Sequence, residues 1–575
     1  MKKFLSLVLA LVMAMSLVTV SAGAKDFNDS DKISDIAYEE AVNVMSEMGI
    51  IDGYGDGNFQ PQGTLTRGAA AKIIACMMLG KTTAEALGTQ AAPFKDVPVG
   101  STFAGYIAYC SETGIIDGYS DGTFRPGNTL TGFAFLKMLL TALGYDSTVE
   151  GFANNANWTV NVAGRAKQIG LLDGNDAFVG TRAATREEAC LYAVNALQAT
   201  LVEYKDKGGN ITVGDISIDT AASNATYVIS NVYDQATSID DTTDNGTQWT
   251  VEFAEKYQPD LRLKGATDAF GRPAHTWTWK NNEVGTYVNY DELVAEYTTK
   301  ITGKDLYDLL GKTALEDCDG SIYVYVDGET ERDVLGDAYF TSNQMAKTYD
   351  EKVGETGNGV LTQVFHNTRD DEITVAVINT YLAKAAEDYD EKNDELDLTV
   401  FAIDEVKRNQ YVKDGDEDSD MTVSGEDFDI AEVAEGDLFL VTVAEGEIQT
   451  MAAPEIMAGS TVTSFRVDKY VVTGGTQYDF ASTARYDVET LYDWTGISAE
   501  SNLKNLTYDI ILDPYGYAIG VKLVEEPNQY VFLTGVDINN SNLAARNADA
   551  NVIFTDGKME TVTVNLRNSR GLDNN

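Results

Sequence analysis

Two kinds of hydrophobic pattern divide this chain. Up to about residue 204, apolar residues recur at spacings of three and four, which is typical of helices packed by one face. After residue 205, short runs alternate Tyr, Thr and Val with polar residues between clusters of Asp, Asn and Gly, which predicts strands. The helical pattern is strongest at 34–48, 66–79, 160–169 and 185–201, and around Ile107 and Leu136. The alternating pattern is clearest at 321–326, 373–377, 438–443, 507–512, 517–524 and 562–566.

One stretch of the helical part occurs three times. Residues 49–67 read GIIDGYGDGNFQPQGTLTR, and residues 114–132 read GIIDGYSDGTFRPGNTLTG. A more divergent copy reads GLLDG at 170–174 and ATRE at 184–187. In each copy a Gly can end a helix, a turn rich in Gly and Asp follows, and a Thr can cap the next helix. Repetition at a period of tens of residues is typical of architectures built from repeated units.

These motifs resemble the S-layer homology (SLH) family. The resemblance is carried by the F-x-D starts at Phe27 and Phe94, the G-Y-x-D-G-x-F-x-P turn and the T-R helix opening, and it covers about residues 27–203. It implies a protein anchored at the bacterial cell surface, with three repeats packed around a pseudo-threefold axis. It further implies that the grooves between repeats hold an acidic, often pyruvylated, secondary cell-wall polysaccharide linked to peptidoglycan.

The predicted fold is multidomain, with an all-α anchor of three helix-pair repeats followed by mainly β (α+β) modules. We expect a short helix at about 303–310 within the β-rich part. The last alternating strand ends a few residues before Asn575, so either the reading frame is truncated or this strand completes a neighbour's sheet. The expected boundaries are a signal peptide at 1–24, repeats at 25–88, 89–147 and 148–204, and β-rich modules at 205–349, 350–459 and 460–575.

The first 24 residues have the features of a secretory signal. Lys2 and Lys3 precede an apolar core at 4–20, and an A-x-A cleavage site follows at 22–24. An uncleaved membrane anchor is the alternative, but the apolar run is short for a spanning helix. We therefore expect an exported protein of the cell wall or S-layer that is not inserted in a membrane after cleavage.

The acidic charge is concentrated in the β-rich part. The net charge of the chain is −48. Residues 25–204 carry 12 basic and 21 acidic residues, a net of −9, whereas residues 205–575 carry 28 and 69, a net of −41. So acidic a surface repels nucleic acid and anionic lipid, which excludes both as partners. It keeps a crowded surface protein soluble, and of two interpretations, recruitment of divalent cations or a solvated acidic shell, we favour the acidic shell.

Two arginines of the repeat motif are the strongest site candidates. Arg67 and Arg186 directly follow the capping residues Thr66 and Thr185, at the positive end of a helix. A guanidinium can hold a carboxylate by two N–H groups, and we expect the helix end to add free N–H groups. The resemblance implies that this corner binds the acidic glycan. The alternative is that each arginine pairs with a nearby Asp and fixes the packing of the repeats.

The three copies differ at this corner. Gly132 occupies the arginine position in copy two, which puts that groove in doubt. Tyr54 and Tyr119 follow the Asp-Gly turns of copies one and two, and their rings suit the apolar faces of sugars. Trp158 is a weaker candidate of the same kind. Turn formation alone accounts for the neighbouring Asp and Gly residues.

Metal and redox chemistry have little support in the sequence. Aspartates alternate at 414–420 as at the start of a calcium loop, but the Gly and Glu that an EF-hand needs at its sixth and twelfth positions are absent. We expect no cofactor, leave a loose Ca²⁺ contact open, and favour a disordered acidic loop. The four cysteines show no C-x-x-C spacing, which predicts buried free thiols.

Catalytic motifs are equally weak. His275 and His366 lie far apart and belong to no metal-binding motif. Trp277 and Trp279 alternate as on one face of a strand, which predicts core packing. Our leading hypothesis is a structural surface protein, not an enzyme, that assembles laterally with itself. The alternative is a surface enzyme or carbohydrate-binding protein tethered by the same repeats, which needs a cleft with two carboxylates within 205–575.

Overall fold

A computed structural model gives the fold of this 575-residue chain. The chain divides into two units, Met1–Val400 with Asp404–Ala453, and Phe401–Ile403 with Pro454–Asn575. The predicted signal peptide lies outside the described residues. The structure describes residues 27–153, 156–213, 216–220, 222–230, 249–318, 321–330, 347–401, 418–425, 427–428, 430–466, 469–484, 507–524, 531–537, 547–555 and 557–565.

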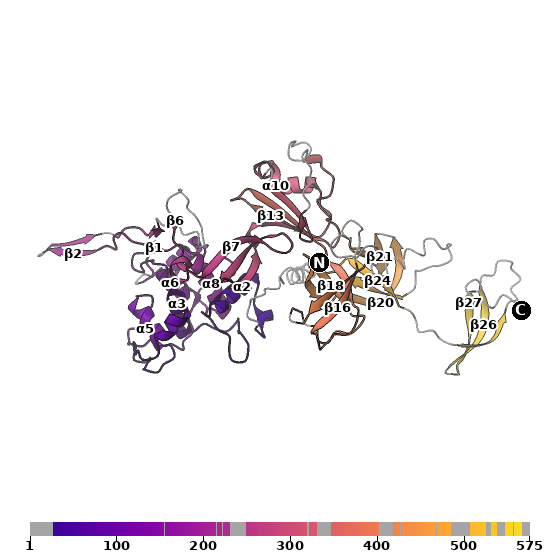
Figure 1. Ribbon diagram of the computed structural model, residues 1–575, viewed down its shortest axis with the longest axis horizontal. Coiled ribbons are helices and arrows are strands. Elements are labelled where there is room, and N and C mark those ends of the chain that lie inside the picture. The colour runs from indigo at the N-terminus through magenta and orange to yellow at the C-terminus, as the bar shows by residue number, and fades with distance from the viewer. Residues whose placement is uncertain are drawn as a thin grey trace. The chain divides into compact units, whose positions relative to one another are not determined.

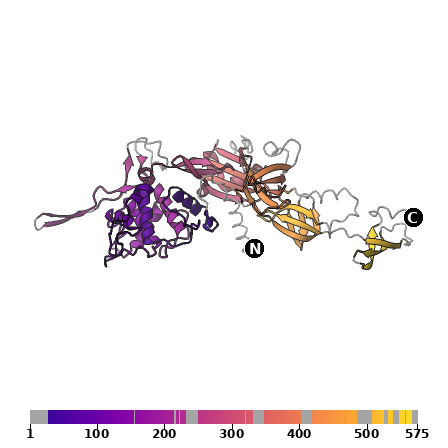
Figure 2. The same cartoon turned by 60° about the horizontal axis from the view of Figure 1, so that its bottom comes forward.

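The N-terminal part is helical, as predicted, and its helices lie together in Figures 1 and 2. Each repeat supplies two main helices, and the connecting turns hold the Gly-Asp motifs. The main pairs are α2 (Ile36–Glu47) with α3 (Arg67–Leu79), α5 (Ala104–Glu112) with α6 (Gly132–Ala142), and α7 (Trp158–Gln168) with α8 (Arg186–Gln198). Two short helices accompany them, η1 (Ser30–Lys32) and α4 (Lys81–Ala86).

The three repeats close into a ring. The second helix of each repeat packs against the first helix of the next one, α3 on α5, α6 on α7 and α8 on α2. Three backbone hydrogen bonds close the centre: Leu65 N–H donates to Ala184 O at 2.8 Å, Ala184 N–H to Leu130 O at 2.9 Å, and Leu130 N–H to Leu65 O at 2.8 Å. These positions are equivalent in the three copies. The pseudo-threefold arrangement implied by the resemblance is therefore present.

In the first two repeats, the F-x-D motif fastens the Gly-Asp turn to the start of its repeat. The carboxylate of Asp29 accepts hydrogen bonds from the N–H groups of Phe59 and Gln60 at 2.6 and 2.9 Å. Asp96 accepts the equivalent pair in copy two, both at 2.7 Å. The Phe of the motif also contacts the Phe of the turn, with ring centroids 5.2 Å apart for Phe27 and Phe59. The turns that precede Thr66 and Thr131 are thus each held in place by a carboxylate and by an aromatic contact.

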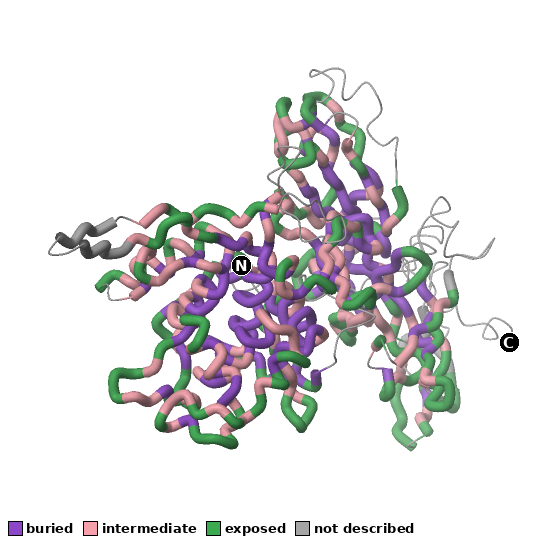
Figure 3. The backbone as a smooth tube through the Cα atoms, turned by 60° about the vertical axis from the view of Figure 1, so that its left-hand side comes forward, coloured by how far each residue is buried: buried purple, intermediate pink, exposed green. Residues whose placement is uncertain are grey.

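The hydrophobic core of the anchor continues into the chain beyond residue 204. Phe253 of α9 (Phe253–Tyr257) and Trp277 of β8 (Pro273–Trp279) are buried in the same cluster as the helices. β8 lies between β7 (Leu261–Thr267) and β9 (Asn282–Val288) in an antiparallel sheet. Figure 3 shows the buried backbone in purple through the helices and strands. Trp277 is 0% exposed, so the predicted core role of this side chain is confirmed.

Two five-stranded sheets follow in the first unit. In the first, β10 pairs with β13 and β11 runs parallel to β14, so the sheet spans the cut expected near residue 350. The helix predicted at 303–310 is present as the start of α10 (Gly303–Asp317), which kinks at Gly311 (φ 80°). The sheets have the orders β10-β13-β14-β11-β12 and β17-β16-β15-β18-β19. Their strands are β10 (Leu293–Tyr297), β11 (Ile322–Val326), β12 (Glu329–Thr330), β13 (Leu361–Asn367), β14 (Glu372–Ile378), β15 (Tyr381–Ala385), β16 (Glu395–Phe401), β17 (Asp418–Ser424), β18 (Leu438–Ala444) and β19 (Glu447–Ala452).

The remaining strands form small sheets in the first unit and two further sheets in the second. The second unit has the order β22-β21-β20-β23-β24 and a separate three-stranded sheet β25-β26-β27. Its strands are β20 (Glu455–Arg466), β21 (Tyr470–Thr473), β22 (Thr476–Asp479), β23 (Thr507–Leu512), β24 (Ala518–Leu523), β25 (Val531–Asp537), β26 (Asn547–Phe554) and β27 (Met559–Asn565). The small pairs of the first unit are β1 (Val202–Glu203) with β4 (Thr226–Tyr227), β2 (Gly209–Val213) with β3 (Ile216–Thr220), and β5 (Ile229–Ser230) with β6 (Trp249–Thr250).

All four cysteines are buried and free, as predicted. Burial raises the pKa of the Cys76 thiol to about 11 and those of Cys110 and Cys190 to about 12. These thiols therefore stay protonated at neutral pH and are poor nucleophiles. Among the described residues, no helix has the length and apolar character that a membrane crossing requires.

Candidate functional site

The two candidate arginines begin equivalent helices. Thr66 caps α3, and its Oγ1 accepts a hydrogen bond from Ala69 N–H at 3.3 Å. Thr185 caps α8 in the same way at 3.3 Å, and Glu188 completes a capping box. Each arginine is therefore the first residue of its helix, as the sequence predicts. The threonine side chains are engaged by the helix ends that they cap.

The N–H groups at these helix ends are not free, which corrects one sequence-based expectation. Arg67 N–H and Gly68 N–H donate to the carbonyls of Asn128 and Pro126, both at 2.9 Å. The equivalent groups of α8 donate to carbonyls in the turn of copy one, at 2.8 and 3.1 Å. The next repeat's turn thus takes up the backbone donors because it lies directly over the helix end. Any anion bound at this corner must be held by side chains.

Both guanidinium groups are held by main-chain carbonyls of the neighbouring turn. Arg67 Nε donates to Phe124 O at 2.9 Å and its Nη2 to Asp117 O at 3.1 Å. Arg186 makes the equivalent bonds to Phe59 O and Asp52 O, both at 2.8 Å. The alternative prediction, in which each arginine pairs with a nearby Asp and fixes the packing of the repeats, holds in part, because each guanidinium bonds an Asp of the neighbouring repeat at its main-chain O and not at its carboxylate. Within the described part of the chain, neither arginine forms a salt bridge, so the positive charge at each corner is not neutralised by direct contact.

An aromatic pair lies against each guanidinium. Arg67 Cζ is 5.1 Å from the ring centroid of Tyr119 and 4.4 Å from that of Phe124. Arg186 Cζ is 4.8 and 4.6 Å from the rings of Tyr54 and Phe59. The tyrosine of each pair remains exposed, at 48% for Tyr54 and 40% for Tyr119. Each corner thus combines a fixed cation with an accessible aromatic ring.

Burial also affects the Arg67 guanidinium. It lowers the pKa of this group below its ordinary value. A guanidinium remains protonated throughout the physiological range even after such a shift. The charge at this corner is therefore permanent, whereas its hydration is reduced, which strengthens electrostatic contacts made there.

A cavity of about 380 Å³ adjoins Arg67, and we call it the Arg67 groove. Sequence reasoning missed Lys137 in it. This lysine lies six residues after the capping Thr of its repeat, as Lys72 does in copy one, and that repeated position was the available signal. Trp158, a candidate from the sequence, forms part of the wall. The groove is lined by Arg67, Ile115, Ile116, Asp117, Leu130, Ala134, Lys137, Met138, Phe152, Ala153 and Trp158.

The corner at Arg186, which we call the Arg186 corner, has additional internal ion pairs. Asp52 contacts Lys72 at 3.4 Å and Lys81 at 3.3 Å. Burial raises the pKa of Asp52, but the two lysines outweigh this effect and lower it. The carboxylate therefore stays ionised and is already paired. Lys72, Lys81 and Arg186 thus all lie beside Asp52, whose main-chain O accepts a hydrogen bond from Arg186.

The third corner has lost these features. Gly132 replaces the arginine, and a Cβ there would lie 3.0 Å from the ring of Phe178. Phe178 packs edge-on against Phe133 and Tyr192, with centroids 5.5 and 5.9 Å apart. The position of Tyr54 and Tyr119 is taken here by Asn175, which is buried and donates to Tyr192 Oη at 2.8 Å. The site that holds a cation in the other two copies is filled by aromatic side chains.

Metal binding gains no support from the described residues. They contain no group of three or more His, Cys, Asp or Glu arranged to hold a metal ion. Of the proposed calcium loop, Asp414 and Asp416 lie outside the described residues, as does the side chain of Asp418. Asp420 is described, and it accepts a hydrogen bond from Thr399 Oγ1 at 3.5 Å.

Comparison with known proteins identifies the repeats and a group of relatives. The model of the S-layer homology domain matches residues 26–71 and 93–136, which lie in the first two repeats. The chain is 28% identical over 214 residues to the surface layer protein of Brevibacillus choshinensis, covering 37% of this chain and 18% of that protein. It is 24% identical over 356 residues to the middle cell wall protein of Brevibacillus brevis, covering 61% and 31%.

A third relative is the cell surface protein of Thermoanaerobacter kivui. The identity is 26% over 231 residues, which cover 40% of this chain and 28% of that protein. The chain thus spans less than a third of the length of each of these three relatives.

Proposed function

We propose that this chain, which carries S-layer homology domains, is a structural protein held non-covalently to the cell wall through the Arg67 groove and the Arg186 corner. Its similarity to surface layer and cell surface proteins identifies it as an exported protein of the cell surface. The single observation that carries the proposed mode of attachment is the state of the two arginines. Each is fixed by main-chain carbonyls and lies against an exposed tyrosine, without a carboxylate partner among the described residues.

The ligand that fits this arrangement is an acidic sugar. A carboxylate can accept hydrogen bonds from the guanidinium N–H groups that do not bond the main-chain carbonyls. Such charge-assisted hydrogen bonds are stronger than those between neutral groups. The apolar face of a pyranose ring can lie on Tyr54 or Tyr119. We therefore propose a pyruvylated secondary cell-wall polysaccharide linked to peptidoglycan, with Thr66 and Thr185 fixing the helix starts from which the arginines project.

The proposal assigns the strand-rich residues 205–575 to an outer layer. With a net charge of −41 over residues 205–575, it projects from the wall as an acidic layer. We propose that copies assemble laterally into a lattice and that the protein performs no reaction. Electron microscopy of the mature protein with and without Ca²⁺ tests this part, because ordered two-dimensional sheets are expected in at least one condition. Isolated particles in both conditions would contradict it.

Binding to isolated cell walls tests the anchoring. Arg67→Ala and Arg186→Ala should each weaken co-sedimentation about tenfold, since a hydrogen bond to a charged group contributes about 1.5–3 kcal/mol. The double variant should remain in solution. Arg369→Ala, at an exposed position in the β13–β14 turn, is the matched control and should bind like the wild type. Walls stripped of their acidic polysaccharide should retain none of these proteins, and retention of the double variant on intact walls would overturn the proposal.

A further inference from the structure

The third groove of the anchor, between α8 and α2, is covered by this chain's own β-sheet. β7, β8 and η2 (Tyr290–Glu292) approach the groove from outside the repeats. A cavity of about 480 Å³ remains between them and the two helices. Its lining includes Asp173 and Leu191, which occupy the same repeat positions as Asp117 and Lys137 of the Arg67 groove. It is lined by Ala37, Glu40, Ala41, Asp173, Gly174, Leu191, Val194, Asn195, Gln198, Leu263, Gly265, His275 and Asp291.

Specific polar contacts join the sheet to α2. Glu40 Oε1 accepts a hydrogen bond from Trp277 Nε1 at 2.6 Å and lies 2.8 Å from His275 Nε2. One turn further along the helix, Asn43 Nδ2 donates to Tyr287 Oη at 3.1 Å in a buried position. Trp277 is fully buried at this junction. A tryptophan that is both desolvated and hydrogen-bonded indicates a built interface.

His275 lies between two hydrogen-bond acceptors in this junction. Its Nδ1 lies 2.6 Å from Asn289 Oδ1, and Asn289 Nδ2 donates to Glu292 Oε1 at 3.4 Å, which fixes the orientation of the amide. Both ring nitrogens of His275 therefore face acceptors, and the imidazolium form satisfies both. Burial alone would lower the pKa of His275, but Glu40 and Asn289 raise it above its ordinary value.

The charge of this groove is opposite to that of the other two corners. Glu40, Asp173 and Asp291 line it, Gly132 stands in the arginine position, and Leu191 stands in the position of the groove lysine. Among the described residues that line this groove, His275 is the one basic side chain available to an anionic glycan, and it already contacts Glu40. The groove thus lacks the chemistry that favours an acidic sugar.

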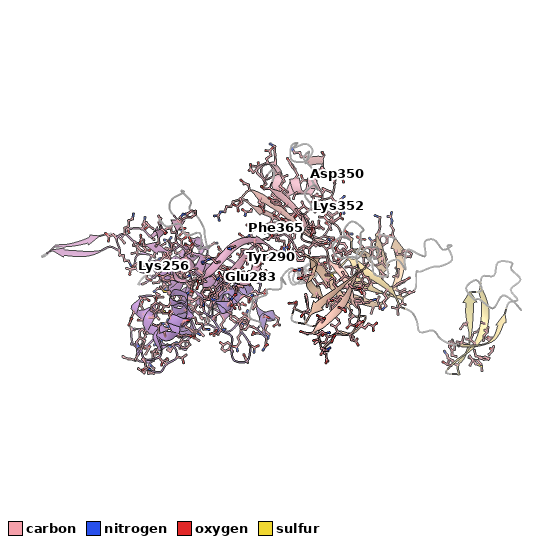
Figure 4. All side chains as sticks on the ribbon, viewed as in Figure 1. Lys256, Glu283, Tyr290, Asp350, Lys352 and Phe365 are labelled. Atoms are coloured by element: carbon pink, nitrogen blue, oxygen red, sulfur yellow. The ribbon has the colours of Figure 1, made fainter. Side chains whose placement is uncertain are left out.

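The same hairpin also reaches the next sheet. At its tip, between β7 and β8, Asp268 and Arg272 form a buried ion pair at 2.6 Å. Arg272 Nη1 hydrogen-bonds Gln363 of β13 at 3.2 Å and Tyr290 Oη, labelled in Figure 4, at 3.4 Å. A Cβ on Gly271 would overlap the ring of Tyr325 on β11. The hairpin therefore contacts the anchor along its strands and the following sheet at its tip.

We infer that the third groove has become the docking site for the β7–β9 sheet, which couples the anchor to the outer modules, and that the anchor offers two glycan sites in place of three. The number of glycan sites rests on the proposed function, whereas the docking stands on the contacts above. Attachment to the wall and attachment to the outer modules use different corners of one ring.

Amide hydrogen exchange of the full chain tests the docking without any ligand. Trp277→Ala should lower the protection of α2 amides at least tenfold and leave those of α6 within twofold of the wild type. Trp277→Phe keeps most of the ring and removes only the N–H donor, so it serves where the alanine variant does not fold, and it should cause a smaller loss confined to α2 and β8. Unchanged protection of α2 in both variants would overturn the docking.

Native mass spectrometry of the full chain with a monosaccharide carrying a 4,6-pyruvate ketal tests the number of sites. We expect two bound sugars per wild-type chain, one in either single arginine variant and none in the double variant. Three sugars on the wild type, or binding by the double variant once Trp277→Phe is added, would show that the third groove is a glycan site and overturn the inference. No binding by the wild type would refute the proposed ligand and with it the two-site count, and the exchange experiment then decides the docking by itself.

Discussion

The Arg67 groove and the Gly132 corner occupy equivalent positions of one ring but have opposite properties. In both, a Thr caps the helix and the backbone donors of its first turn are taken up by the neighbouring turn. In the Arg67 groove the side chains then leave a cation and a lysine in the wall of a cavity, and an exposed tyrosine against the guanidinium. At the Gly132 corner they supply packed aromatic rings and, further along, acidic residues covered by a sheet. The backbone frame fixes where a site can be, and a few side chains decide what it binds.

Aromatic truncation gives the largest contrast in stability. Phe178→Ala at the Gly132 corner should cost about 2–3 kcal/mol in the free energy of unfolding, because the ring packs against Phe133 and Tyr192. Tyr119→Ala in the Arg67 groove should cost well under 1 kcal/mol, since that ring is 40% exposed. Urea unfolding measures the first effect, and wall co-sedimentation should show weakened binding for the tyrosine variant alone. Equal stability losses would remove the distinction between the two corners.

The pH dependence of stability distinguishes the docked corner from the arginine corners. The pKa of His275 is raised in the folded protein, so its contribution is fully present below the unfolded value near 6.5 and is lost as pH rises through the folded value. Charged hydrogen bonds of this kind contribute about 2 kcal/mol. His275→Gln should therefore destabilise the protein at pH 5.5 and matter much less at pH 9, as measured by urea unfolding at each pH.

The arginine corners supply the control for this prediction. Arg67→Ala should shift stability by a similar amount at both pH values, because its guanidinium does not titrate in this range. If the difference between His275→Gln and the wild type were constant from pH 5.5 to 9, His275 would not be held as a cation in the folded protein.

Helix caps provide the smallest and most closely matched test. Thr66→Ala and Thr131→Ala each remove a side-chain cap of the same geometry, at 3.3 and 3.4 Å, and each should cost about 1 kcal/mol. Thr66→Ala loosens the helix start that carries Arg67 itself, whereas Thr131 caps α6, which supplies only the wall of the groove and Lys137, so Thr66→Ala should weaken wall binding more, by about two- to threefold. Thermal unfolding and co-sedimentation measure the pair. Equal binding losses would indicate a general effect of anchor stability.

The repeat units could be predicted because their signals are local. The Gly-Asp turns, the capping threonines and the apolar spacing place the helix pairs, and their ring follows from the resemblance. The roles of Arg67 and Arg186 as first helical residues were also readable from the capping Thr. Their partners were not, because the carbonyls of Phe124 and Phe59 come from another repeat and any residue type can supply a carbonyl.

The covered third groove depends on contacts distant in the sequence. Glu40 and Trp277 lie 237 positions apart, and neither pattern indicates the other. The alternation of Trp277 and Trp279 correctly predicted a buried strand face but not the helix on which it packs. Gly132 in the arginine position indicated from the sequence that this corner differs from the other two. That the β7–β9 sheet covers the adjoining groove could be learned only from the fold. Lys137 was detectable in principle from its match to Lys72.

A crystal structure of the full chain with an acidic fragment of the wall polysaccharide tests the central claim most directly. We predict one carboxylate within hydrogen-bonding distance of the Arg67 guanidinium, a second at Arg186, and the β7–β9 sheet still seated between α8 and α2. A fragment bound beside Gly132, or on the outer sheets with both arginine corners empty, would contradict the account.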